Sequence, residues 1–105
     1  MNEVPASGLP DDIYLLDVRE DDEWTAGHAP GAVHIPLGLL GRQAGQVPKD
    51  QPVYVICRAG GRSARAAQML GASGWDVTNV ADGMQGWAGA GRPMVSESGG
   101  PPFVA

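Results

Sequence analysis

Residues 53–73 read VYVICRAGGRSARAAQMLGAS, and this stretch decides the fold. It joins a short apolar run typical of a buried strand, a glycine-rich turn and a segment with the apolar spacing of a helix. A strand, a turn and a helix in this order place the residue that ends the strand over the N-terminus of the helix. That residue is Cys57, the only cysteine in the chain.

The position of Cys57 favours an ionised thiol, because free backbone N–H groups and the positive end of the helix dipole meet at a helix N-terminus. Three of the seven Lys and Arg residues lie here, Arg58, Arg62 and Arg65, in a chain of net charge −5. A lone cysteine after an apolar strand is more often a small buried hydrophobe. The arginines, placed where the dipole opposes them, instead indicate a reactive thiolate and an anionic reactant.

The rest of the chain alternates predicted strands with predicted helices. We expect strands at 13–18, 32–35, 53–56 and 76–80, and helices at 20–26, 37–45, 64–73 and 84–88. This alternation predicts an α/β fold, a small open mostly parallel sheet with helices on both faces. Ligands bind such sheets beyond the carboxyl ends of the strands, where Cys57 stands. We expect one domain over 13–95, an N-terminal segment at 1–12 and an irregular or loosely docked tail at 96–105.

Composition excludes several classes of protein. Apolar residues make up 43% of the 105-residue chain, and no apolar run approaches the roughly 20 residues that span a bilayer, so no membrane partner is expected. The net acidity argues against a nucleic-acid partner. The start of the sequence lacks the features of a signal peptide, and one cysteine forms no internal disulfide, which predicts a cytoplasmic protein. One Cys and two distant His lack metal-ligand spacing, so we expect no metal and no cofactor.

Other polar residues have structural interpretations. Asp17 and Arg19 end a predicted strand, and we expect them to pair with each other or to brace the loop after Cys57. His28 is expected to hold a turn by hydrogen bonds, because spacing identifies no carboxylate partner for it. Seven of the twelve acids lie between Asp11 and Glu23, which we interpret as the solvated start of a helix.

Four separated motifs together resemble the single-domain rhodaneses, a family of sulfurtransferases, over roughly residues 13–95. They are DVRE at 17–20, WTAGHAPGA at 24–32, CRAGGRS at 57–63, and GMQGW at 83–87 followed by GRP at 91–93. Three positions depart from the family pattern. Ala29 replaces a larger aliphatic residue, Met84 stands where glycine is common, and Ala59 lacks the hydroxyl found in many family loops.

The resemblance implies a thiosulfate sulfurtransferase that works without a cofactor. Cys57 would be the catalytic nucleophile, taking sulfur from a small anionic donor such as thiosulfate and passing it to cyanide, a thiol or a protein acceptor. The donor would be bound by the loop residues Arg58, Ala59, Gly60, Gly61, Arg62 and Ser63, with Asp17 and Arg19 in support. One of Arg58 and Arg62 would attract the donor while the other braces the loop, and the sequence does not assign the two roles.

Two other functions stay open. Cysteine phosphatases and arsenate reductases also use a cysteine loop before a helix, but the phosphatase loop has five residues between Cys and Arg, whereas four separate Cys57 from Arg62. The shorter loop makes a smaller cradle, which favours sulfur over a tetrahedral phosphate. A persulfide relay or an interaction module is the alternative from another class. Inert modules usually lose the cysteine, whereas a relay would keep it.

Overall fold

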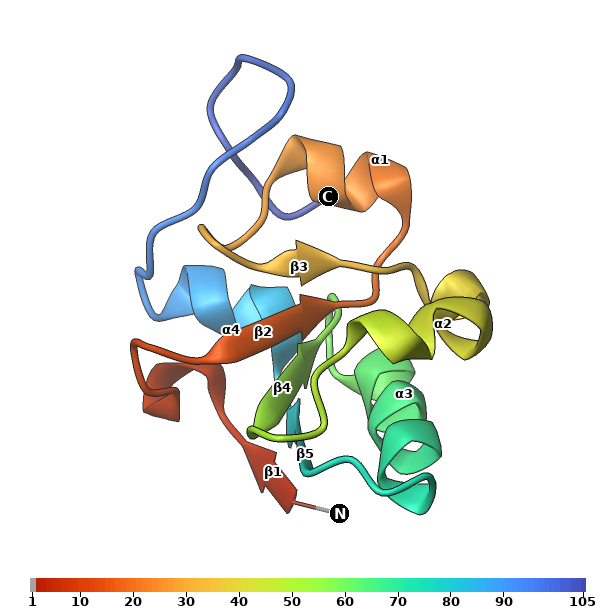
Figure 1. Ribbon diagram of the computed structural model, residues 1–105. Coiled ribbons are helices and arrows are strands. Elements are labelled where there is room, and N and C mark those ends of the chain that lie inside the picture. Colours follow the sequence, from red (N-terminus) through yellow and green to blue (C-terminus); the bar gives the residue numbers. More distant parts are fainter. Residues whose placement is uncertain (1) are drawn as a thin grey trace.

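A computed structural model describes residues 2–105 of the chain, which form a five-stranded sheet in the order β1-β5-β4-β2-β3 (Figure 1). All neighbouring strands are parallel. The strands are β1 (Asn2–Val4), β2 (Tyr14–Asp17), β3 (Val33–His34), β4 (Val53–Ile56) and β5 (Val77–Val80).

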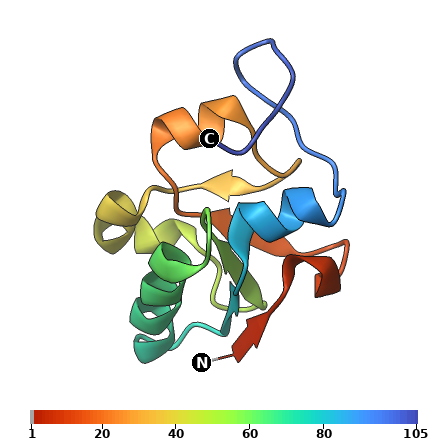
Figure 2. The same ribbon diagram turned by 180° about the vertical axis from the view of Figure 1, so that it is seen from behind.

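The helices lie on both faces of the sheet (Figures 1 and 2). They are α1 (Asp21–Ala26), α2 (Leu37–Gln43), α3 (Gly61–Ala72) and α4 (Gly83–Gly89), with 3₁₀ turns at Ala6–Gly8 and Ala44–Gln46. The pair α2 and α3 covers one face and α4 the other, so the predicted α/β arrangement is confirmed. None of the helices within residues 2–105 has the length and apolar character to cross a membrane.

Two buried clusters explain the apolar strands. Successive side chains of a strand point to opposite faces of its sheet. Val53 and Val55 of β4 therefore pack in the cluster beneath α2 and α3, while Ile56 joins Met84 and Trp87 of α4 on the other face. Complete burial of one such aliphatic side chain contributes about 1.5–3 kcal/mol. Because both faces are covered, the two ends of the sheet are the parts that are left for a site, and Cys57 lies at the carboxyl end.

Strand β1 was not predicted from the sequence. It is three residues long, and its first two residues are exposed, so it carries no apolar pattern. Backbone pairing places it at the edge of the sheet, with Asn2 opposite Thr78 and Val4 opposite Val80 of β5. The N-terminal segment therefore contributes an edge strand.

The segment at 96–105, called the tail segment below, contains no helix or strand and is docked on α1. The N–H groups of Glu97 and Phe103 donate to the carbonyls of Thr25 (3.0 Å) and Ala26 (3.1 Å). These carbonyls belong to the last turn of α1, where backbone acceptors have no partner within the helix. Figures 1 and 2 both show the tail segment doubling back and ending beside α1.

Candidate active site

Cys57 follows the carboxyl end of β4 and is only 1% exposed. Its Sγ accepts two hydrogen bonds from the loop and the start of α3. The Gly60 N–H lies 3.1 Å from Sγ, and the Ser63 hydroxyl lies 3.3 Å from it. The sulfur therefore sits among donors at the N-terminal end of a 12-residue helix, where negative charge is favoured.

The pKa of the Cys57 thiol is set by two opposing effects. Burial raises it, because a thiolate loses solvation in the protein interior. Hydrogen bonds from the Ser63 side chain and from the backbone of Ser63, Gly60 and Ala59 outweigh burial, so the pKa lies below its ordinary value. The direction agrees with the expectation from the sequence.

Gly60 makes the close turn of the loop possible. Its φ of +106° is in the left-handed region, and a Cβ at this position would collide with the carbonyl of Ala81. The Gly60 carbonyl accepts a hydrogen bond from the buried side-chain amide of Asn79 (3.2 Å). Asn79 is thus a supporting residue that sequence reasoning did not identify, since nothing in its spacing links it to the loop.

Helix α4 holds the loop from the other side. The N–H groups of Met84 and Gln85 donate to the carbonyls of Cys57 (2.8 Å) and Arg58 (3.0 Å). A Cβ at Gly83, whose φ is +57°, would lie 2.5 Å from both of these carbonyl oxygens. The C-terminal motif that begins at Gly83 therefore shapes the cysteine loop through the backbone.

Arg62 forms a two-point ion pair with Glu23 of α1. Its Nη1 and Nη2 atoms lie 2.6 and 2.8 Å from the two carboxylate oxygens. The hydrogen bond from Arg62 lowers the pKa of Glu23 to about 2, and the same contact raises the pKa of the guanidinium. The interpretation of the acidic stretch as a solvated helix start is therefore wrong for Glu23, which turns toward the loop while Asp21 and Asp22 do not.

Arg58 has a different environment. It is exposed, and its Nε donates to the main-chain oxygen of Ala105 in the tail segment at 3.0 Å. The two arginines of the loop thus have separate partners, one on α1 and one on the tail segment.

Asp17 and Arg19 pair with each other, one of the two arrangements expected from the sequence. Both are fully buried, and Arg19 donates from Nε to Oδ1 (3.0 Å) and from Nη2 to Oδ2 (2.8 Å) of Asp17. Nη2 also donates to the Gly27 carbonyl (2.8 Å). The pair therefore ties the turn after α1 to the end of β2. Helix α1 carries Glu23.

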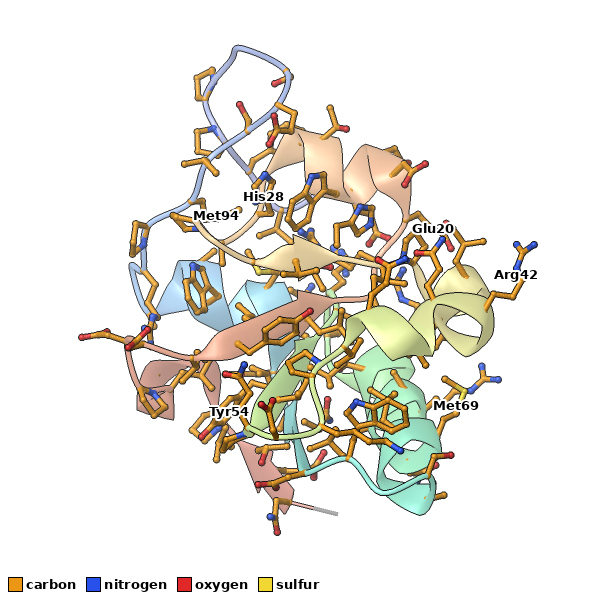
Figure 3. All side chains as sticks on the ribbon, viewed as in Figure 1. Glu20, His28, Arg42, Tyr54, Met69 and Met94 are labelled. Carbon is orange, nitrogen blue, oxygen red and sulfur yellow. The ribbon has the colours of Figure 1, made fainter. Side chains whose placement is uncertain are left out.

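His28 lies between α1 and the tail segment, as Figure 3 shows, with Met94 nearby. Its Nε2 lies 2.9 Å from a carboxylate oxygen of Glu97, and its Nδ1 lies 3.1 Å from the Ala29 carbonyl. The ring stacks on Trp24 with centroids 3.5 Å apart. Glu97 is the carboxylate partner that spacing did not reveal, because 69 residues separate the two. Across residues 2–105, no three His, Cys, Asp or Glu side chains gather in a way that would hold a metal ion.

The comparisons with known proteins agree with this geometry. The sequence pattern of the rhodanese-like domain family matches residues 5–90, and the chain belongs to this family. A protein named "Sulfurtransferase" from Allochromatium vinosum is 32% identical over 106 residues, covering 94% of this chain and 99% of that protein. The crystal structure of a rhodanese-related protein from Thermoplasma volcanium matches with a TM-score of 0.86 and 31% identity, over 90% of this chain and 98% of that one.

A third relative is longer. The "Putative sulfur carrier protein YrkF" of Bacillus subtilis is 41% identical over 78 residues, which are 73% of this chain but 42% of that protein. This chain therefore spans less than half of that relative. Taken together, the family and the names of these relatives support a general role in sulfur transfer.

Proposed function

We propose that this protein is a sulfurtransferase that moves sulfane sulfur from a donor such as thiosulfate, through a persulfide on Cys57, to a thiophilic acceptor such as cyanide, a thiol or a protein. The observation that carries the proposal is the set of donors aimed at the buried Sγ of Cys57. They favour a thiolate without a separate general base. Because Cys57 is the one thiol of the chain, it is the candidate nucleophile.

The reaction takes two displacement steps. The Cys57 thiolate attacks the outer sulfur of thiosulfate, an S–S bond forms, and the bond to the sulfonate sulfur breaks with its electron pair leaving on sulfite. The resulting terminal sulfur of the persulfide sits near the same N–H donors, which stabilise its negative charge. Cyanide then attacks this terminal sulfur, thiocyanate leaves, and the Cys57 thiolate returns.

The contacts of the two arginines support different roles for them. Arg62 is committed to Glu23 at two points, so we assign it to bracing the loop against α1. Arg58 is exposed and bonded through one nitrogen, so we assign it to attracting the anionic donor. We place this activity in residues 13–95, within the reducing cytoplasm, where a free thiol persists.

A persulfide relay is the second candidate, favoured by the name of the sulfur-carrier relative. A relay would use the same loop but would deliver sulfur to a protein partner. A phosphatase is disfavoured because Arg62 is turned to Glu23, which leaves its guanidinium occupied rather than open to a phosphate.

Steady-state kinetics test the proposal. Thiosulfate and cyanide are varied together, and parallel double-reciprocal lines are expected because sulfite leaves before cyanide binds. Replacing cyanide with a small dithiol separates an enzyme from a relay, since a relay turns over slowly with every small acceptor. Intersecting lines, or hydrolysis of an aryl phosphate at a comparable rate, would contradict the assignment.

A further inference from the structure

Both arginines that flank the Cys57 loop have partners within the chain. Arg62 is held by the two oxygens of Glu23, and Arg58 is held by the main-chain oxygen of Ala105. Arginine binds an oxyanion best when two adjacent N–H groups are free to donate in parallel. With Nε of Arg58 occupied, the fork made by Nε and the neighbouring nitrogen is closed to a donor.

The tail segment is docked at points other than Arg58, so its contact with Arg58 is part of a larger interface. The Glu97 carboxylate bonds to His28, the Phe103 N–H bonds to Ala26, and Val104 packs against the buried cluster beneath α4. These contacts lie at Glu97 near the start of the segment and at Phe103 and Val104 near its end. They place Ala105 at the loop by fixing the residues just before it.

Gly27 provides the space that the tail segment occupies. A Cβ at Gly27 would lie 2.5 Å from the carbonyl oxygen of Phe103 and 2.8 Å from its nitrogen. The φ of Gly27 is 173°, an extended conformation that any residue adopts. Close approach of the tail segment, rather than backbone conformation, is therefore what a side chain at this position would prevent.

We propose that the tail segment determines which sulfur donors the loop accepts. Docked, it occupies Nε of Arg58 and so weakens the attraction of anionic donors relative to uncharged ones. Released, it frees Arg58 to attract an anion such as thiosulfate. The family match covers residues 5–90, and the tail segment follows it in the chain. The inference rests on the proposed sulfur transfer for its biological meaning, while its physical test does not require turnover.

The test uses two alkylating reagents of similar size, anionic iodoacetate and neutral iodoacetamide, on Cys57 as the single thiol. Both reagents react with the thiolate, so the fraction of thiolate cancels in the ratio of their rates. The ratio therefore reports the electrostatic environment that the reagent meets at Cys57. Val104→Asn removes the apolar anchor of the tail segment. The ratio of iodoacetate to iodoacetamide rates is expected to rise, by less than the roughly threefold effect of one unit charge at about 6 Å in a water-like dielectric, because Arg58 keeps its charge while docked and gains only a free Nε–H on release.

Matched variants make the result specific. Phe103→Asn makes a similar change at the neighbouring side chain, which is 60% exposed, and should leave the ratio unchanged. Val104→Asn combined with Arg58→Ala should show no rise over Arg58→Ala alone, because the effect passes through Arg58. Gly27→Ala dislodges the tail segment from the α1 side and should give the same rise. In an active protein, the KM for thiosulfate should fall in parallel.

Hydrogen exchange shows whether the tail segment is released. The Phe103 amide should be protected in the unaltered protein and should exchange faster in Val104→Asn. An unprotected Phe103 amide in the unaltered protein would overturn the proposal, and so would an unchanged alkylation ratio once release is observed. A falling ratio would also overturn it, because the tail segment would then be presenting Arg58 rather than withholding it. If the ratio rises but no sulfur is transferred, only the proposed function fails.

Discussion

The two ends of the sheet offer different surroundings. At the amino-terminal end, the face of α3 beside β5 borders an open groove of about 470 Å³ that is lined in part by Gln68, Trp75 and Asp76. At the carboxyl end, Cys57 lies in a closely packed loop and is almost without exposure. The groove has space but no nucleophile. The loop has little space, yet it has a sulfur surrounded by N–H and O–H donors.

With the proposed function, this difference makes the size of a cavity a poor guide to chemistry in this fold. A reaction that transfers one sulfur atom needs a stabilised anion and a narrow approach, not a large volume. The carboxyl end provides these through backbone geometry, because β4, α3 and α4 all direct polar groups there. We therefore expect all sulfur chemistry at the carboxyl end and none in the groove. Four predictions about residues at the carboxyl end follow from this comparison.

The largest expected effect is the loss of activity in Cys57→Ala. Removing the only thiol should abolish thiosulfate:cyanide turnover while thermal unfolding stays close to that of the unaltered protein. Gln68→Ala, at the groove, is the matched control and should retain full activity. Residual turnover above the blank in Cys57→Ala would move the chemistry away from the loop.

The second prediction concerns Ser63, whose hydroxyl donates to Sγ. Hydrogen bonding lowers the pKa of Cys57, so Ser63→Ala should raise it. A lost hydrogen bond to a charged group is worth about 1.5–3 kcal/mol, or roughly one to two pKa units. The measurement is the rate of Cys57 alkylation by iodoacetamide as a function of pH. A midpoint equal to that of the unaltered protein would show that the hydroxyl does not support the thiolate.

The third prediction concerns pH and the pair of Glu23 with Arg62. The pKa of Glu23 falls from 4.5 to about 2 on folding, so the pair stabilises the fold above about pH 4.5. This stabilisation is lost as pH falls toward 2, because the unfolded chain takes up the proton first. It should amount to about 1–2 kcal/mol once the partial exposure of Arg62 is considered.

Denaturant unfolding of Glu23→Gln at pH 7 and pH 3 measures this contribution. The variant should lose less stability than the unaltered protein between the two pH values. Asp22→Gln, on the same helix but exposed, is the control and should keep the full dependence. An equal change in the free energy of unfolding between the two pH values in Glu23→Gln and the unaltered protein would show that the ion pair does not stabilise the fold.

The smallest expected effect is that of Arg58→Ala. Because the docked tail segment already engages Arg58, kcat/KM for thiosulfate should fall only about two- to threefold, less than 1 kcal/mol. Lys49→Ala removes a positive charge that lies 4.0 Å over the Trp75 ring, at the groove end, and should leave kcat/KM unchanged. Equal losses in both variants would indicate a general effect of net charge rather than a site at the carboxyl end.

The sequence predicted the sheet and the place of Cys57 between a strand and a helix, because both depend on local signals. The run from Val53 to Ile56 and the glycines after Cys57 determine a strand, a turn and a helix within one short stretch. The start of α3 was predicted at residue 64 but lies at Gly61, because Gly60 with positive φ lets the helix begin directly after the turn. Edge strand β1 escaped prediction, since its pairing with β5 is a backbone contact without an apolar pattern.

The supporting contacts could not be predicted, because they join residues far apart in the sequence. Arg62 and Glu23 are separated by 39 positions, and Arg58 and Ala105 by 47. One arginine was expected to attract an anion and the other to brace the loop, but only the folded structure shows which one α1 engages. The tail segment was expected to be irregular or loosely docked. Its docking depends on free carbonyls at the end of α1 and on the missing side chain of Gly27, neither of which a linear pattern reveals.

The most direct test of the central claim is the intact mass of the protein after incubation with thiosulfate. The fresh, reduced protein is loaded, freed of small molecules and weighed by mass spectrometry. With no second cysteine to resolve it, a Cys57 persulfide should persist, so the account predicts a gain of one sulfur atom per chain. Cyanide should reverse the gain, and Cys57→Ala should never show it. An unchanged mass in the loaded protein, or an equal gain in Cys57→Ala, would contradict the account.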